Sequence, residues 1–294
     1  MKNKLFDLAI IFVGYIACIY SMVLTWNLLI DSNIFFKLLA CHVEATIFIY
    51  ILSVAFKNSS WYDAFWSVVP VVLTILCWID IHAEGNVLRA GMMFDVMVFW
   101  AIRLTYNWAR SWDGFTHEDW RYVMMKGKAK NKFQYFLTDF GAIHLIPTLS
   151  VFMALLPMNY TLYYPGPDVF WLDWVAYSIG ISAVFIQIIS DQQMYNFRRS
   201  LTEPQTMQSG LWFYSRHPNY LGEILFWFSF FIFSLSNGLA ASWLIIGTIT
   251  MYVLVAITSV AMMDKRSLER RHDFKDYMDT TPAIFFNFVK RKSS

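Results

Sequence analysis

The densest group of reactive side chains in this sequence lies between Ser209 and Glu223, in the run Ser-Gly-Leu-Trp-Phe-Tyr-Ser-Arg-His-Pro-Asn-Tyr-Leu-Gly-Glu. Pro218 suits the first turn of a helix, where its missing N–H costs nothing. Arg216 and His217 would then stand at the positive end of the helix dipole, beside backbone N–H groups without intrahelical partners. Because such an end attracts phosphate and carboxylate groups, we expect Arg216 and His217 to form an anion site.

Polar residues continue along the helix predicted after this site. Asn219, Glu223 and Trp227 follow one another at i, i+4 and i+8, which places them on one helix face. A carboxylate such as that of Glu223 needs a partner in apolar surroundings, for example a ribose hydroxyl, an amide or an arginine. Upstream, Asp191 and Arg198 share a helix face if the preceding helix continues through both residues.

A second polar segment runs from Glu118 to Tyr122 and packs two acids, one arginine and two aromatic residues into five positions. Helical spacing could place Glu118 and Tyr122 on one side. One interpretation is a binding element, and the other is a loop that its aromatic residues anchor at a membrane surface. Earlier in the chain, Arg103 and Arg110 share a helix face with Asn107, and Arg103, the deeper of the two arginines, is the better candidate for binding a buried anion.

The elements that carry these residues follow from composition. The chain has 294 residues, of which 57% are hydrophobic and 15% charged, with 13 Trp, 16 Tyr and 27 Phe. Soluble domains have roughly 45–50% apolar and about 25% charged residues. These figures exclude a disordered chain and a nucleic-acid-binding domain. The three cysteines lie in apolar runs and the six histidines in separate segments, so we expect neither a disulfide framework nor a metal site.

A membrane-spanning helix needs roughly 20 mainly apolar residues. Eight stretches meet this requirement: 6–30, 34–56, 64–82, 88–110, 140–158, 170–190, 218–236 and 240–263. With both termini in the cytoplasm, every Lys and Arg except Lys37, Arg89 and Arg103 falls in a cytoplasmic segment, as the positive-inside rule requires. The sequence therefore predicts one all-α domain over residues 1–294, a membrane bundle of about eight helices with a cap of cytoplasmic loops. Residues 236–238 should form a tight turn between the last two helices.

The motifs together resemble a known family. The run from Gly210 to Glu223 resembles the C-terminal signature of the steroid 5-alpha-reductase-like proteins, and more closely that of their large, mostly uncharacterised branch. Four other elements of that branch occur in the same order: Asp-x-Phe-Trp at 63–66, Trp-x-x-Arg-Leu at 100–104, Glu-Asp-Trp-Arg-Tyr at 118–122 and Asp-x-Gln at 191–193. The resemblance covers about residues 60–286.

This resemblance implies a membrane reductase that binds NADPH from the cytoplasm without a Rossmann fold, and the sequence indeed has no Gly-x-Gly-x-x-Gly motif. Asp63 falls near the family's catalytic carboxylate, and Trp100 aligns with a family tyrosine. The steroid reductases have Gln-Glu where this branch has Asp63. The residues expected to contact the cofactor, from the matched motifs and the anion site, are Arg103, Glu118, Arg121, Tyr122, Asp191, Arg198, Arg216, His217, Asn219, Tyr220 and Glu223.

The expected reaction is reduction of a polarised carbon–carbon double bond in a lipid or steroid-like substrate. A hydrogen-bond donor on the substrate carbonyl would stabilise the developing enolate, an effect often worth about 3–4 kcal/mol. Asp63 could supply that bond if its apolar surroundings keep it protonated. The diphosphate of the cofactor would meet Arg198, Arg216 and the start of the following helix.

Two alternatives stay open. Membrane methyltransferases of isoprenylcysteine or phospholipids have a similar Arg-His-Pro-x-Tyr stretch and use S-adenosylmethionine. A transporter or lipid-binding scaffold could use Asp95 and Arg103 as a pathway, although the sequence shows no internal repeat. In each case the expected partners are the lipid bilayer and a small hydrophobic molecule, not nucleic acid. The expected location is the endoplasmic reticulum of a eukaryote or the inner membrane of a bacterium.

Overall fold

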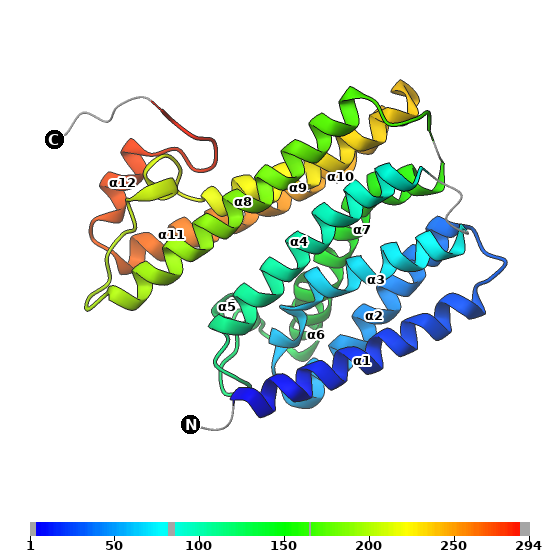
Figure 1. Cartoon of the computed structure of the whole chain (residues 1–294). Helices are drawn as coiled ribbons and strands as arrows, with labels where there is room; N and C mark the ends of the chain where they lie inside the picture. The colour runs from blue at the N-terminus through cyan, green and yellow to red at the C-terminus, as the bar shows by residue number, and fades with distance from the viewer. Residues whose placement is uncertain (1–3, 82–85, 165, 289–294) are drawn as a thin grey trace. The chain divides into compact units, whose positions relative to one another are not determined.

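The computed structural model describes residues 4–81, 86–164 and 166–288, and every regular element within these ranges is helical (Figure 1). This confirms the predicted all-α fold class. The chain divides into two compact units, Met1–Pro167 and Asp168–Ser294. Each unit is described by itself.

The first unit is built from long helices joined by short helical turns. Its elements are α1 (Lys4–Leu28), α2 (Ile34–Phe56), the 3-10 turn η1 (Ser59–Tyr62), α3 (Phe65–Asp80), α4 (Val87–Ser111), α5 (Trp120–Lys126), α6 (Lys132–Phe136), the π-helix η2 (Leu137–Leu145) and α7 (Ile146–Tyr163). The loop predicted over 111–139 therefore contains α5 and α6, and α6 continues through η2 into α7.

The described part of the second unit has three long helical stretches and a short helical end. Its elements are α8 (Trp171–Ser200), η3 (Gly210–Phe213), α9 (Pro218–Ser234), η4 (Leu235–Asn237), η5 (Leu239–Leu244), α10 (Ile245–Tyr252), the π-helix η6 (Val253–Ser259), α11 (Val260–Arg270) and α12 (Phe274–Thr280). The predicted turn at 236–238 is present, and Gly238 has the positive φ of 93° that a residue without a side chain adopts most easily.

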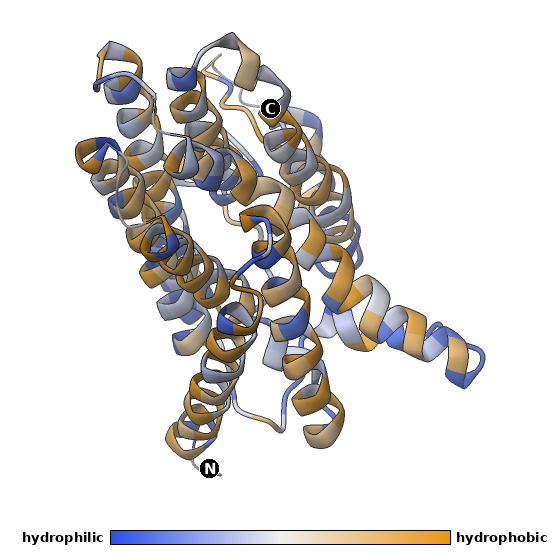
Figure 2. Cartoon of the chain, turned by 90° about the vertical axis from the view of Figure 1, so that its right-hand side faces the viewer, coloured by the Kyte–Doolittle hydropathy of each residue, from blue (hydrophilic) through white to orange (hydrophobic). Residues whose placement is uncertain are grey.

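Among the described residues, seven helical stretches are long and apolar enough to cross a membrane, and apolar residues line most of their length (Figure 2). They are Lys4–Leu28, Ile34–Phe56, Ser59–Asp80, Lys132–Tyr163, Trp171–Ser200, Pro218–Asn237 and Ala240–Arg270. The chain is thus a polytopic membrane protein, with seven such stretches where we predicted about eight. The difference is α4, which forms a helix over nearly the predicted range but is not among the seven, because Arg89, Asp95, Arg103 and Arg110 lower its hydropathy.

At one end of the first unit, the start of α1 is tied to the end of α4. Lys4 Nζ donates to Arg110 O at 3.0 Å, and the Phe115 amide donates to Asp7 Oδ2 at 3.1 Å. Gly114 adopts a φ of 89°, and a Cβ at this position would lie 2.4 Å from Asp7 Oδ2. The turn after α4 therefore needs glycine both for its backbone conformation and for the space that Asp7 occupies.

Elsewhere in the first unit a buried cation links α1, α2 and α3. Lys37 Nζ lies 2.9 Å from both carboxylate oxygens of Asp80 and 4.5 Å from the centre of the Trp26 ring. Only 1% of the Lys37 side chain is exposed. A charge buried this deeply needs its partner, since an unpaired ion loses its hydration without compensation.

We expect Asp80→Asn to lower the free energy of unfolding by about 3 kcal/mol, because it leaves the buried ammonium of Lys37 without a counter-ion. Thermal unfolding of the detergent-purified protein measures this loss. Asp31→Asn is the matched control, since Asp31 lies on the exposed turn between α1 and α2. Equal melting temperatures for the two variants would contradict the role assigned to the ion pair.

In the second unit α8 and α9 pack at very close distance. A Cβ added to Gly222 would lie 2.5 Å from Gln187 Cγ and 2.7 Å from the Ala183 carbonyl oxygen, so only glycine allows this approach. The segment after α12 runs beside residues 214–217: the amides of Arg216 and His217 donate to the carbonyls of residues 282 and 283 at 2.9 and 3.0 Å. The end of the described chain is thereby fixed against the start of α9.

Candidate functional site

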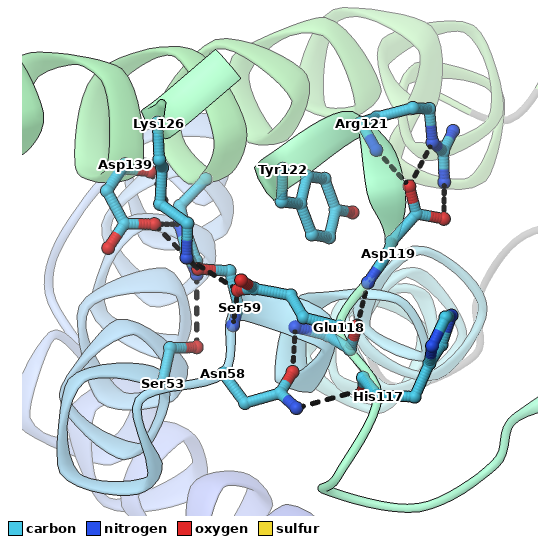
Figure 3. Close-up of polar contacts among 12 residues, drawn as sticks. Ser53, Asn58, Ser59, His117, Glu118, Asp119, Arg121, Tyr122, Lys126 and Asp139 are labelled. Carbon is cyan, nitrogen blue, oxygen red and sulfur yellow. Dashed lines mark hydrogen bonds and ion pairs between the residues drawn. The ribbon is translucent and has the colours of Figure 1, made fainter. Parts of the chain in front are cut away.

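In the first unit, the segment around η1 and the segment around the start of α5 lie side by side in one register. Four contacts join a residue of 58–63 to the residue 59 positions later in the sequence, and Figure 3 shows most of these residues. Four hydrogen bonds do this: Asn58 Nδ2 to His117 O at 3.0 Å, Ser59 N to Glu118 Oε1 at 2.6 Å, Asp119 N to Ser60 Oγ at 3.0 Å, and Tyr122 Oη to Asp63 Oδ1 at 2.8 Å. We call this arrangement the paired segments.

The local sequence explains why the paired segments have this shape. Asn58 caps η1, because its side-chain oxygen accepts from the Ser60 amide at 2.9 Å, as asparagine does at helix starts. Its side-chain amide donates to the carbonyl of Phe115 as well as to that of His117. Asp119 caps α5 in the same way, accepting from the Arg121 amide at 2.8 Å. Two caps thus fix both segments where they meet.

Glu118 is held by the protein itself. Its Oε1 accepts from Lys126 Nζ at 2.5 Å. Only 16% of the Glu118 side chain and 9% of the Lys126 side chain are exposed. Lys126 also donates to Ser59 Oγ at 3.0 Å, and Ser59 Oγ donates to Asp139 Oδ1 at 2.7 Å (Figure 3). The sequence predicted a cofactor contact for Glu118, and the structure places it in a buried ion pair that supports the turn carrying Asp63.

The same polar network continues into the helices. His144 Nδ1 lies 2.7 Å from the carbonyl oxygen of Asp139 and 3.9 Å from its Oδ1, and His144 Nε2 lies 3.1 Å from Ser53 Oγ. Asp139 and His144 are five residues apart, and the π-helix η2, with its wider turn, brings them to one side. No sequence pattern indicates these two residues as a pair, because a regular α-helix would not place them together.

Beside this network lie two adjacent pairs, Tyr122 with Asp63 and Arg121 with Asp119. Arg121 binds Asp119 with two bonds, Nε to Oδ1 at 2.8 Å and Nη2 to Oδ2 at 2.9 Å. Burial and the nearby charge of Asp63 raise the pKa of Tyr122 well above its usual value, so the phenol stays a neutral O–H donor. Burial alone would lower the pKa of Arg121, but its bonds to Asp119 raise it, and the guanidinium stays charged.

The ion pair of Arg121 with Asp119 makes the folding stability depend on pH. Burial opposes ionisation of Asp119, but the bonds from Arg121 outweigh it and hold the pKa of Asp119 below its usual range. Stability from this group is therefore fully present above about pH 4, the unfolded value, and is lost as the pH falls through the lower folded pKa. We expect Asp119→Asn to flatten the fall of melting temperature below pH 4, whereas Asp113→Asn, at an exposed position, should keep the wild-type slope.

The helix α4 carries the two remaining predicted residues of this unit. Trp100 is fully buried, and Arg103 is partly buried one turn further along. Arg110, predicted to share a helix face with Arg103 and Asn107, does lie beside Asn107: its Nε and Nη2 donate to Asn107 Oδ1 at 3.0 and 2.8 Å. The paired segments thus bring Asp63, Glu118, Arg121 and Tyr122 together, and these bonds do not involve the α4 residues.

In the second unit the predicted acid and arginine lie on one long helix, since α8 continues through both as expected. Asp191 is buried, and Arg198 lies within electrostatic range of Asp191 and Tyr220. A further arginine, Arg271, follows α11, and burial together with the positive charge of Arg198 lowers its pKa. Two arginines held near each other attract an anion. No sequence pattern indicates this pairing, because Arg198 and Arg271 are far apart in the chain.

The predicted anion site at the start of α9 has a different occupant. Pro218 is the first residue of α9 and His217 its N-cap, as predicted. However, Arg216 Nη2 lies 2.9 Å from Asp264 Oδ2, and His217 Nε2 lies 2.9 Å from Asp264 Oδ1. Arg216 Nη1 also donates to the carbonyls of Met278 and Thr281. The anion beside these two side chains is therefore the protein's own carboxylate, and the group ties the end of the chain to α9.

Further along α9, the predicted polar face has found partners within the unit. Glu223 accepts from Gln187 Nε2 at 2.9 Å and from Trp227 Nε1 at 3.0 Å, so an amide is one of the partners expected for this carboxylate. Tyr220 stacks on His217 with ring centres 5.2 Å apart. Asn219 Oδ1 is buried and accepts no hydrogen bond from the described residues. A buried acceptor of this kind suits a ligand that brings a hydroxyl or an amide donor.

Within the described ranges, no group of three or more His, Cys, Asp or Glu side chains is arranged to hold a metal ion. The predicted site residues include acids, arginines and two tyrosines. These lie in two places: the paired segments of the first unit, and the Asp191–Arg198 side of α8 with the start of α9 in the second.

Comparison with known proteins gives two matches. A family described as "Protein of unknown function (DUF1295)" matches residues 49–281. The chain is also 25% identical over 259 residues to "Uncharacterized protein C594.04c" of Schizosaccharomyces pombe, covering 80% of this chain and 74% of the yeast protein. No solved structure matches this chain significantly.

Proposed function

The chain belongs to the DUF1295 family, and we propose that it is a membrane reductase that uses NADPH to reduce a polarised carbon–carbon double bond of a lipid or steroid-like substrate. The observation that carries this proposal is the hydrogen bond from Tyr122 to Asp63 at 2.8 Å, beside the charged Arg121. A neutral phenol, a carboxyl group and a guanidinium form the kind of donor set that stabilises a developing oxyanion.

The acid group works as a chain of two donors. Tyr122 donates to Asp63 Oδ1, and the Ser60 side chain also hydrogen-bonds this carboxyl group, so that a protonated Asp63 would be held in a fixed orientation to donate to the carbonyl oxygen of a substrate. The positive charge of Arg121 stabilises negative charge that develops there, although Asp119 reduces that charge in the resting protein. The paired segments hold all four groups before the substrate arrives, so little reorganisation is needed during the reaction.

The second unit offers groups that fit a dinucleotide. Arg198 and Arg271 would hold a diphosphate, and the unsatisfied Oδ1 of Asn219 would accept from a ribose hydroxyl or an amide. When bound, NADPH supplies a hydride to the carbon β to the carbonyl. Glu223 would contact the cofactor with its carboxylate held in one orientation by hydrogen bonds from Gln187 and Trp227. Arg216 and His217 would position the start of α9 through Asp264 rather than by touching phosphate.

The alternative activity is transfer of a methyl group from S-adenosylmethionine by an enzyme of the isoprenylcysteine or phospholipid type. It shares the Arg-His-Pro-x-Tyr stretch, but it gives the Tyr122–Asp63 pair no part to perform. Under either activity we propose that both termini lie in the cytoplasm, since the basic residues gather in the segments between spans on that side.

The test is ligand binding followed by product analysis. We expect NADPH, but not S-adenosylmethionine, to raise the melting temperature of the purified protein, since a ligand stabilises the state that binds it. Lipid extracts from cells with the wild-type protein should contain one lipid with two more hydrogens than the corresponding lipid that accumulates in cells with Glu223→Gln. Glu269→Gln, at an exposed position on α11, is the matched control. Stabilisation by S-adenosylmethionine alone, with a methyl-group mass difference, would favour the alternative.

A further inference from the structure

The segment that follows α5 and begins the membrane-spanning stretch Lys132–Tyr163 is unusually basic and exposed. We propose that residues 127–137, called the basic arm here, bind the surface of a bilayer that contains anionic phospholipids. This inference concerns the first unit alone, and it does not depend on the proposed reductase activity.

The region around the basic arm carries an excess of positive charge. Between residues 120 and 138 there is no Asp or Glu, and the basic residues are Arg121, Lys126, Lys128, Lys130 and Lys132. The first two are neutralised by Asp119 and Glu118. The other three are exposed and form no ion pair with any described residue. The basic arm therefore presents three uncompensated positive charges in five residues.

These lysines lie at the start of a membrane-spanning stretch. Lys132 is the first residue of the stretch Lys132–Tyr163, which is apolar and long enough to cross a bilayer. Hydrogen bonds fix the turn in front of it: the Gln134 amide donates to Asn131 Oδ1 at 2.9 Å, and the Lys130 amide donates to Gln134 Oε1 at 2.8 Å. Lys128, Lys130 and Lys132 therefore stand where the headgroups of the lipids begin.

Exposed apolar and aromatic side chains follow the lysines. Phe133 and Tyr135 are 69% and 45% exposed, and Leu137 is 49% exposed. Aromatic residues with this exposure at the end of a spanning helix favour the boundary between headgroups and acyl chains. Phe136 is exposed to a similar extent and also packs against Tyr50 and Phe140, which holds the helix in place. A soluble anion would use only the lysines, whereas a lipid surface uses both the lysines and the rings.

Juxtamembrane clusters of Lys and Arg attract anionic lipids, and each basic residue near the surface adds to the attraction. Three lysines therefore predict a preference of at least about tenfold for an anionic over a zwitterionic phospholipid, and this preference should weaken as salt screens the charges.

The experiment is native mass spectrometry of the full-length protein in detergent, titrated with phosphatidylserine or phosphatidylcholine. We expect the triple variant Lys128→Gln/Lys130→Gln/Lys132→Gln to lose the preference for phosphatidylserine about tenfold and to bind phosphatidylcholine as before. The matched control is Lys265→Gln/Arg270→Gln/Lys275→Gln, which removes the same charge from exposed positions of the second unit and should keep the preference. Phe133→Ser should weaken binding of both lipids.

Several results would overturn the proposal. Equal losses in the two triple variants would mean that net charge, not the basic arm, attracts the lipid, and no loss in either would mean that the arm is not involved. Glycerophosphoserine that competes as well as the intact lipid would identify a soluble phosphate ligand instead. If the triple variant does not fold, the three single variants must each lose part of the preference, and unchanged single variants would overturn the proposal.

Discussion

Replacing Tyr122 with phenylalanine should lower the rate of double-bond reduction by about 100-fold or more, the usual loss when one donor to a developing oxyanion is removed. The substitution deletes only the hydroxyl that donates to Asp63 Oδ1. The side chain is 8% exposed, so the ring of phenylalanine keeps the packing. Product formation by the purified protein with NADPH and its lipid substrate is the measurement.

The control is Tyr135→Phe, which removes a hydroxyl from an exposed tyrosine and should leave the rate unchanged. Asp63→Asn should cause a loss similar to that of Tyr122→Phe, and the double variant should lose little more, because the two groups act as one donor chain. Independent, additive losses would show that they act separately. Since burial raises the pKa of Tyr122 well above its usual value of about 10, ionisation of this phenol should not limit the rate below that pH.

Replacing Asp264 with asparagine should lower the free energy of unfolding by about 3 kcal/mol, because it removes the carboxylate that both Arg216 and His217 bind. The loss should be local as well as global. Arg216 connects this carboxylate to the carbonyls of Met278 and Thr281, so residues 277–288 should exchange their amide hydrogens faster in the variant.

Hydrogen exchange with mass spectrometry, together with thermal unfolding, measures both effects. Asp276→Asn is the control, since Asp276 lies on the exposed side of α12 and should leave exchange near α9 unchanged. A variant at Asp264 that melts like the wild type would show that solvent or another side chain replaces the lost carboxylate.

The fold class and most of the helices could be predicted because they depend on local properties of the chain. Runs of about 20 apolar residues define most spans, Pro218 marks the start of α9, and Gly238 marks the turn before the next arm. The continuation of α8 through Asp191 and Arg198 also followed from local pattern. Where charges interrupt the run, as in α4, local hydropathy no longer decides whether a helix crosses the membrane.

The partners of the charged residues could not be predicted, because they depend on contacts between distant parts of the chain. Arg216 and His217 have the composition of an external anion site, yet Asp264 lies close enough to neutralise them. Glu118 belongs to a recognisable motif, yet Lys126 and the Ser59 amide occupy its carboxylate. A sequence motif gives the residue types at a site, and only the tertiary fold decides which of them are already paired.

The wide turn at η2 has a consequence for how this protein tolerates changes of length. An α-helix completes a turn in 3.6 residues, so deleting one residue between Phe140 and Ile143 would let the segment relax into a regular α-helix without breaking it. A π-helical turn holds about one residue more than an α-helical turn, so the segments on either side of the deletion would keep their faces relative to each other. Asp139 and His144 would then stand four positions apart, a spacing that places two side chains on one face of an α-helix, and the hydrophobic length of the span would hardly change. A single codon loss here should therefore yield a protein that inserts, folds and keeps the connection between Ser59 and Ser53.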